Sequence, residues 1–276
     1  MMQGWMFDGL PLLRYEPTEM RIRVRAGGTE IADTTRAMLV WEPRRIVPSY
    51  AVPLADLRCE PAESTVEPVP ARGRLLDPGI PFVAHTSPGT TVDVVAGDTR
   101  FAGAGFRLED EALAEYVVLD FWAFDEWLGE DEVLVAHPRD PYHRVDVRQS
   151  SRTVRLEVDG VLLAESSRPV LVFETNLPMR YYLPRADVVA ELVPSDRSSA
   201  CAYKGHATYF SAAGYTDLAW SYAEPLDGAT QLAGLIAFLD DKLTVSVDGR
   251  HREQRPSPGA VIFRDRLGLK QTQQQS

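Results

Sequence analysis

One structural unit occurs twice in the chain, and this internal repeat constrains the fold more than any other feature of the sequence. Residues 20–36 align with residues 153–168, sharing both the spacing of apolar residues and the position of a turn. Ile22 and Val24 alternate with arginines, and Val154 and Leu156 alternate with charged residues in the same way. A period of two is typical of a β-strand with one buried face. The repeat therefore predicts two similar, mainly β units in tandem.

Each repeat is predicted to begin with a β-hairpin. Gly27 and Gly28 separate two strand patterns in the first repeat, and Asp159 and Gly160 separate them in the second. Such pairs accept the positive φ values of a two-residue turn. The glycine pair is not interpreted as a phosphate-binding loop, because no Lys-Ser/Thr and no helix follow it.

The repeat continues beyond the hairpin and predicts further elements. Residues 38–42 match residues 170–174, and Tyr50, Pro53 and Asp56 match Tyr181, Pro184 and Asp187. A buried strand or helix end is expected at 116–120 and, as its counterpart, at 235–238. A strand is expected to follow at 132–135 in the first repeat and at 242–247 in the second. Clusters of helix-forming residues predict short helices at 109–115, 124–128 and 229–236.

These matches give the expected domain boundaries. The Pro-rich, charged stretch at 137–148 has the composition of a surface connection. The predicted parts are an N-terminal segment at 1–19, a first and divergent repeat at 20–136, a linker at 137–150, a second repeat at 151–250 and a C-terminal tail at 251–276. We expect the two repeats to pack as an intramolecular pseudo-dimer.

Composition limits the partners that the chain can have. Of the 276 residues, 45% are hydrophobic, enough for a packed core in each repeat. The net charge is −11, with 40 acidic against 29 basic side chains, which argues against binding to nucleic acid. No apolar run reaches the roughly 20 residues of a membrane span, and the first residues do not resemble a signal peptide. We expect a soluble, cytoplasmic protein with no membrane partner.

Metal and disulfide chemistry are not expected. Cys59 and Cys201 are far apart in sequence and cannot form a disulfide framework or paired zinc knuckles. The histidines lack the spacing of metal ligands. We predict no metal site and no cofactor.

Three motifs of the second repeat carry a resemblance to a known family. They are Leu-Pro-Met-Arg-Tyr-Tyr-Leu-Pro-Arg-Ala-Asp at 177–187, Cys-Ala-Tyr-Lys-Gly at 201–205 and Trp-Ser-Tyr-Ala-Glu-Pro at 220–225. With the phrase His-Pro-Arg-Asp-Pro-Tyr at 137–142, they resemble two-copy members of the domain-of-unknown-function family 427. The resemblance implies a β-tent-like fold without zinc knuckles. It implies no established activity, although the label nucleotidyltransferase is sometimes attached to the family.

The first repeat departs from the family pattern. His-Thr-Ser-Pro-Gly at 85–89 stands in the place of residues 201–205, and no Trp-Ser-Tyr follows. If the chain has one working site, we expect it in the second repeat. Nucleotidyl transfer would require carboxylates two residues apart after a glycine-rich turn, and no Asp-x-Asp follows Gly27 and Gly28.

The leading functional hypothesis is a small-molecule-binding module with an aromatic pocket in the second repeat. Aromatic rings with nearby cations suit a planar or anionic ligand. Aromatics in strands more often fill a core, and of this set Tyr182 and Trp220 are the ones most expected to do so. Tyr203 and Tyr209 belong to the same aromatic set. The predicted ligand-binding residues are Arg180, Tyr181, Tyr182, Lys204, Trp220 and Tyr222.

Two alternatives remain open. An enzyme of unassigned class would use Lys204 as an anion anchor or acid, a tyrosine (Tyr181 or Tyr222) as proton donor, and Glu174 or Asp187 as base. Cys201 beside Lys204 could instead be a nucleophile, since an ammonium group favours thiolate. The remaining class is a protein-interaction scaffold.

Overall fold

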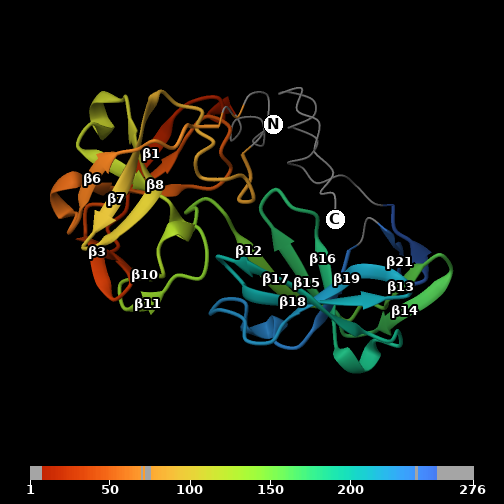
Figure 1. Cartoon of the computed structure of the whole chain (residues 1–276). Helices are drawn as coiled ribbons and strands as arrows, with labels where there is room; N and C mark the ends of the chain where they lie inside the picture. The colour runs from red at the N-terminus through yellow and green to blue at the C-terminus, as the bar shows by residue number, and fades with distance from the viewer. Residues whose placement is uncertain (1–7, 70, 72–75, 240–241, 254–276) are drawn as a thin grey trace. The chain divides into compact units, whose positions relative to one another are not determined.

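The chain folds into two compact units that meet in sequence between Asp140 and Pro141 (Figure 1). The structure is a computed structural model and describes residues 8–69, 71, 76–239 and 242–253. Antiparallel strands dominate both units, and the helical turns η1–η5 are each three residues long. The mainly β fold predicted from the repeat is confirmed. Among the residues that the structure describes, no helix combines the length and the apolar character that crossing a membrane requires.

The first unit contains a seven-stranded and a four-stranded sheet. The larger sheet has the order β1-β4-β5-β9-β8-β7-β6, and the smaller has the order β11-β10-β2-β3. The strands are β1 (Arg14–Pro17), β2 (Ile22–Ala26), β3 (Thr29–Thr34), β4 (Met38–Trp41), β5 (Ser49–Pro53), β6 (Glu60–Glu63), β7 (Gly89–Ala96), β8 (Thr99–Leu108), β9 (Tyr116–Leu119), β10 (Glu126–Gly129) and β11 (Glu132–Val133). The 3-10 turns are η1 (Leu54–Asp56), η2 (Glu111–Leu113) and η3 (Phe121–Ala123).

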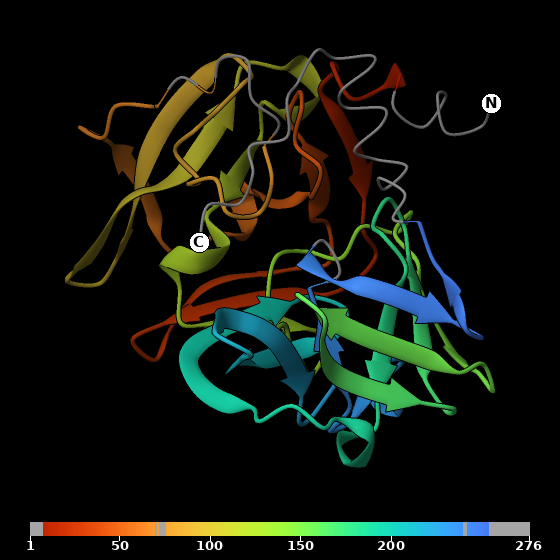
Figure 2. The same cartoon turned by 90° about the vertical axis from the view of Figure 1, so that its right-hand side faces the viewer.

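The second unit repeats this topology. Its larger sheet has the order β12-β15-β16-β20-β19-β18-β17, and its smaller sheet has the order β14-β13-β21-β22. Figure 2 shows β13, β14 and β21 side by side in green and blue. The strands are β12 (Val145–Gln149), β13 (Val154–Val158), β14 (Val161–Ser166), β15 (Val170–Glu174), β16 (Arg180–Leu183), β17 (Val193–Cys201), β18 (Gly205–Ala212), β19 (Tyr215–Tyr222), β20 (Ile236–Phe238), β21 (Thr244–Val247) and β22 (Arg250–His251), with turns η4 (Arg185–Asp187) and η5 (Thr230–Leu232).

The hairpin that begins each repeat forms as the sequence predicts. In both turns the two central residues have positive φ: 57° and 77° at Gly27 and Gly28, and 48° and 78° at Asp159 and Gly160. These values match the right-handed twist of the flanking strands. The alternating residues on the strands are buried, with Ile22, Val24 and Val154 each 0% exposed.

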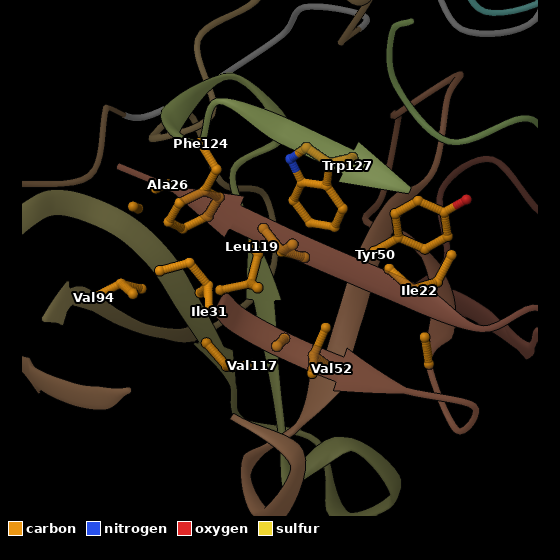
Figure 3. Close-up of a cluster of buried hydrophobic side chains, with 14 of the residues drawn as sticks. Ile22, Ala26, Ile31, Tyr50, Val52, Val94, Val117, Leu119, Phe124 and Trp127 are labelled. Atoms are coloured by element: carbon orange, nitrogen blue, oxygen red, sulfur yellow. The ribbon is translucent and has the colours of Figure 1, made fainter. Parts of the chain in front are cut away.

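The main core of each unit lies between its two sheets. In the first unit, Trp127 of β10 is 2% exposed and stacks on Tyr50 of β5, with ring centroids 5.6 Å apart (Figure 3). Its indole nitrogen donates a hydrogen bond of 2.9 Å to the carbonyl oxygen of Phe121. In the second unit, Val154, Leu156, Leu183 and other buried residues form the matching core. The aliphatic alternation of the sequence is thus what holds the two sheets together.

The expected helices are replaced by strands and short turns. Residues 124–128, predicted as a helix, lead into strand β10, because Trp127 pairs with Val24 and is buried there. Residues 109–115 and 229–236 contain only η2 and η5 as helical turns. Burial against the sheets outweighs helix propensity, which amounts to less than about 1 kcal/mol per residue.

Two other sequence assignments are corrected by strand pairing. The counterpart of β21 is β10, which pairs with β2 as β21 pairs with β13, and not the stretch at 132–135. Residues 145–149, expected in the linker, form the edge strand β12, which pairs with β15. Most of the expected tail, residues 254–276, lies outside the described residues.

One polar network occurs in both units at the same place. In the first, Thr34 donates a hydrogen bond of 2.6 Å to Asp56, and Arg36 pairs with the same carboxylate. In the second, Ser166 donates a 2.6 Å hydrogen bond to Asp187, and Arg168 is its ion-pair partner. Because the two units share the fold and both contain this network, we assign the network a structural role. It fastens the 3-10 turn after β5 or β16 to the end of the first hairpin.

We predict that Asp187→Ala destabilises the second unit by about 1–2 kcal/mol, because the Ser166 hydroxyl, in a residue 3% exposed, loses its acceptor. Thermal unfolding of the full chain measures this change. Asp56→Ala, the matched variant in the first unit, is expected to cost a similar amount. A loss confined to Asp187→Ala would contradict a shared structural role.

Candidate functional site

A buried carboxylate with two cationic or titratable partners lies in the second unit. Glu174 ends strand β15, and its carboxylate contacts Lys204 Nζ through Oε2 and lies 3.1 Å from His143 Nε2 through Oε1. The side chains of Glu174, Lys204 and His143 are 9%, 8% and 21% exposed. We call these three residues the Glu174 cluster.

The Glu174 cluster joins parts of the sheet that are distant in strand order. Lys204 lies in the turn between β17 and β18, and β18 stands four places from β15 in the sheet. In a flat sheet, strands four places apart are separated by roughly 19 Å. The ion pair therefore requires the seven-stranded sheet to curl, so that the β17–β18 turn reaches the end of β15.

The first unit makes the same connection with different groups. Glu42 directly follows β4, the counterpart of β15, and accepts hydrogen bonds from the backbone N–H groups of Thr86 and Ser87 at 2.8 and 2.9 Å. His85 Nδ1 lies 2.8 Å from Glu42, and Arg45 Nε lies 3.3 Å from it. Residues 85–87 precede β7, which again is four places from β4. We call this set the Glu42 cluster.

Burial and charge act in opposite directions on the titration of these groups. Burial alone raises the pKa of Glu174, but the His143 hydrogen bond and the Lys204 ammonium outweigh it, so the pKa lies below its ordinary value. Burial also lowers the pKa of Lys204, and the Glu174 carboxylate reverses this, so the pKa is raised. Both groups are therefore charged at neutral pH.

Aromatic side chains line one face of the same sheet. Tyr182, Trp220 and Tyr222 are 2%, 9% and 5% exposed and belong to one apolar cluster. The Trp220 indole N–H donates a hydrogen bond of 3.2 Å to the Tyr182 hydroxyl. The Arg180 guanidinium lies over the Trp220 ring, 5.8 Å from its centroid. The centroid of the Tyr209 ring, on the neighbouring strand β18, lies 6.4 Å from that of Trp220. We call these five residues the aromatic face.

Tyr181 is separated from the rest of the predicted ligand-binding set. Because successive residues of a strand point to opposite faces, Tyr181 lies in the core between the two sheets, with Leu183. The Arg252 guanidinium lies over its ring at 5.3 Å. The structure thus brings Arg180, Tyr182, Trp220 and Tyr222 together and places Tyr181 behind them.

The remaining candidate residues lie in different surroundings. Asp187 belongs to the network with Ser166 and Arg168, so the two carboxylates proposed as bases, Glu174 and Asp187, have separate partners. Cys201 ends β17, carries a free thiol and packs at the edge of the aromatic cluster. His206, which follows Lys204 by two residues and lies in strand β18, is exposed.

His143 is the residue that sequence reasoning missed. Its spacing from the other histidines does not indicate a site, yet its ring stacks on Tyr203 with ring centroids 4.4 Å apart and contacts Glu174. It stands two residues before β12, in the stretch expected to be a linker. The alternation of Val145 and Val147 that follows is the signal that could have placed this histidine on the sheet.

Strand register identifies which first-unit residues occupy the positions of the aromatic face. In the first unit Ala51 pairs with Val118, which pairs with Phe106. In the second unit Tyr182 pairs with Ala237, which pairs with Trp220, so Ala51 and Tyr182 occupy equivalent positions. The first unit therefore has Ala51, Phe106 and Leu108 where the second has Tyr182, Trp220 and Tyr222. Two tyrosine hydroxyls are thus specific to the second unit.

The sequence match of residues 85–89 with residues 201–205 is wrong by two positions when the strand register is used instead. Gly89 pairs with Leu108, whereas Ala207 pairs with Tyr222. Gly89 is therefore the counterpart of Ala207 and not of Gly205. In the first unit the His85 ring stacks on Phe106, which holds the register position of Trp220, with ring centroids 3.5 Å apart and planes 5° apart.

A shallow surface hollow of about 460 Å³ lies elsewhere, in the first unit. Its lining is Thr90, Val92, Arg107, Leu108, Glu109, Asp110, Glu111 and Ala114. None of the predicted ligand-binding residues contributes to it. In the described part of the chain, no group of three or more His, Cys, Asp or Glu side chains is arranged to hold a metal ion.

Comparison with known proteins identifies related sequences at the level of the family. The family model described as Domain of unknown function (DUF427) matches residues 14–71 and 146–249, more than half of the chain. The first segment begins with β1, and the second runs from β12 to β21. No curated protein matches the chain.

We predict that Lys204→Met destabilises the second unit by about 3 kcal/mol, because it leaves the Glu174 carboxylate buried without its ammonium partner. The double variant Glu174→Gln/Lys204→Met should be closer to the wild type than the sum of the two single variants. A double-mutant cycle in thermal or chemical unfolding measures this coupling. Additive single effects would show that the two side chains do not stabilise each other.

The lowered pKa of Glu174 predicts that the stability of the second unit falls at acidic pH. The folded state binds a proton at this carboxyl less readily than the unfolded state does. The ionised Glu174 carboxylate therefore stabilises the fold above the ordinary pKa of 4.5, and this stabilisation is lost as the pH falls below it. Melting temperature measured between pH 7 and pH 3 should therefore fall more steeply in the wild type than in Glu174→Gln. Parallel curves would contradict this.

Proposed function

This chain belongs to the DUF427 family, described only as a domain of unknown function, and we propose that its second unit binds a small molecule at the aromatic face. The observation that carries the proposal is the difference between the two units. At matching positions of one sheet, Ala51 and Leu108 of the first unit are replaced by Tyr182 and Tyr222 in the second.

The comparison separates residues that maintain the fold from residues that do not. The Ser166–Asp187–Arg168 network and the buried glutamate have counterparts in the first unit, so the shared architecture accounts for them. The tyrosine hydroxyls and Lys204 have none. The Tyr182 hydroxyl accepts the Trp220 indole hydrogen bond and Lys204 pairs with Glu174, so each of these two also serves the fold. The Tyr222 hydroxyl has no hydrogen bond within the described chain, which favours a role in recognition.

The chemistry of the face suits a ligand with a flat, apolar body. The half-buried Tyr209 offers ring surface beside the buried Trp220, and the Arg180 guanidinium adds a cation next to the indole. Lys204 is already neutralised by Glu174, and its raised pKa disfavours a role as a base at neutral pH. These features support binding more than they support the alternative of an enzyme with Lys204 as acid or anchor.

The test is a thermal-shift screen of the full chain against metabolites and nucleotides. At a concentration 100 times the dissociation constant, a bound compound stabilises the folded state by about 2.7 kcal/mol, enough to raise the melting temperature by several degrees. Trp220→Phe, which introduces the residue that the first unit carries, should abolish most of the shift. Consumption of the bound compound over time would reveal an enzyme.

Tyr181→Phe is the matched control, because it also alters an aromatic residue of the sheet but on the opposite face. It should retain the ligand-induced shift. Loss of the shift in Tyr181→Phe and not in Trp220→Phe would place binding away from the aromatic face. No shift with any compound would leave the protein-interaction scaffold as the remaining class.

A further inference from the structure

The chain leaves the smaller sheet of each unit in the same way. The backbone N–H of Leu134 donates a hydrogen bond of 2.8 Å to the carbonyl oxygen of Trp127, and that of Arg252 donates one of 2.8 Å to the carbonyl oxygen of Val245. Trp127 and Val245 hold the same place in the strand pairs β10–β2 and β21–β13. The residues that follow Leu134 therefore correspond to the residues that follow Arg252.

By this register, residues 136–140 correspond to residues 254–258. The two segments read Ala-His-Pro-Arg-Asp and Gln-Arg-Pro-Ser-Pro, with a proline at the third place of each. The structure describes residues 136–140, whereas residues 254–258 lie outside the described residues. The position of the first segment therefore indicates where to expect the second.

In the first unit this segment lies at the Trp41 end of the core between the sheets. Ala136 is 2% exposed. Burial lowers the pKa of Arg14, and the negative charge of Asp140 opposes this effect, so the two side chains interact. The Arg14 guanidinium lies over the Trp41 ring, 5.8 Å from its centroid, and Trp41 is 3% exposed. The segment therefore runs beside the arginine that covers this ring.

The equivalent ring of the second unit is open in the described part of the chain. Trp41 pairs with Arg14 on β1, and Phe173 pairs with Asp146 on β12, so Phe173 is the counterpart of Trp41. Phe173 is 39% exposed, on the same face of the sheet as Leu171 of the core between the sheets. The strand order is the same in both units. What differs is the group that covers the ring.

We propose that residues 254–258 cover Phe173 and thereby close the core of the second unit, as residues 136–140 do at the Trp41 end of the first. Pro256 and Pro258 supply apolar surface for the ring. The inference is independent of the proposed function, because Phe173 points to the face opposite the aromatic face.

The charges of the two units support this assignment. In the first unit the Asp140 carboxylate acts on Arg14. In the second, Asp146 takes the place of Arg14, and Pro258 takes the place of Asp140. A carboxylate at position 258 would be repelled by Asp146, and the neutral proline avoids this repulsion.

A thiol at position 179 reports on this cover. Val172 pairs with Arg180, so the next residues in the register, Phe173 and Met179, lie opposite each other at the end of the strand pair. Met179 packs against the core between the sheets. Met179→Cys therefore places a thiol beside Phe173 and leaves the ring in place. The unsubstituted chain, with its two cysteines, gives the background rate of labelling.

The experiment displaces the segment in the full chain and measures the reaction of this thiol with a maleimide. Pro256→Asp/Pro258→Asp brings two carboxylates toward Asp146 and should release the segment from Phe173. Labelling of Met179→Cys should then become about tenfold faster, as expected if the segment is in place in about nine of ten molecules.

Two matched variants serve as controls. Gln273→Asp/Gln275→Asp adds the same charges at the same spacing outside residues 254–258, and it should leave the labelling of Met179→Cys unchanged. Val161→Cys places the thiol at a site that is 53% exposed and whose counterpart in the first unit, Thr29, is also exposed. Its labelling should be the same with either pair of prolines or aspartates at 256 and 258.

Three results would overturn the inference. Equal labelling of Met179→Cys with and without the two proline substitutions would show that the segment does not cover Phe173. An equal acceleration at Val161→Cys would show that the substitutions loosen the whole unit. A rate for Met179→Cys that rises on dilution of the protein would assign the cover to a second copy of the chain.

Discussion

The buried glutamate at the end of the second strand of each large sheet is the interaction on which the rest of the structure depends. Glu42 and Glu174 both reach a turn that belongs to a strand four places away, and this contact holds the curl of a seven-stranded sheet. An open sheet of that width would expose its inner face to water. With the contact made, each unit has a second small core inside the curl, in addition to the core between its two sheets.

The architecture could be predicted from the sequence because it depends on local patterns. The alternation around Ile22 and Val154 and the turn at Asp159 and Gly160 each act over a few residues, and their repetition fixes the number of units. The helix predicted at 124–128 failed because the burial of Trp127 is a tertiary effect. No local pattern contains that information.

The candidate site was only partly predictable for the same reason. Lys204 and Glu174 were both selected from the sequence, but their direct contact depends on the curl of the sheet. His143 was missed because its role depends on an edge strand in a stretch that reads as a linker. Tyr181 and Tyr182 are adjacent in sequence and indistinguishable in type, yet strand geometry places them on opposite faces.

The two glutamate clusters also differ in how they tolerate mutation. In the first unit, two of the bonds to Glu42 come from backbone N–H groups of Thr86 and Ser87, which almost any residue at these positions would supply. In the second unit, the turn is held by the side chain of Lys204, so one codon determines whether the contact exists. Substitution of the Thr86 or Ser87 side chain therefore leaves these two contacts of the first unit in place, whereas loss of the Lys204 ammonium removes the ion pair of the second.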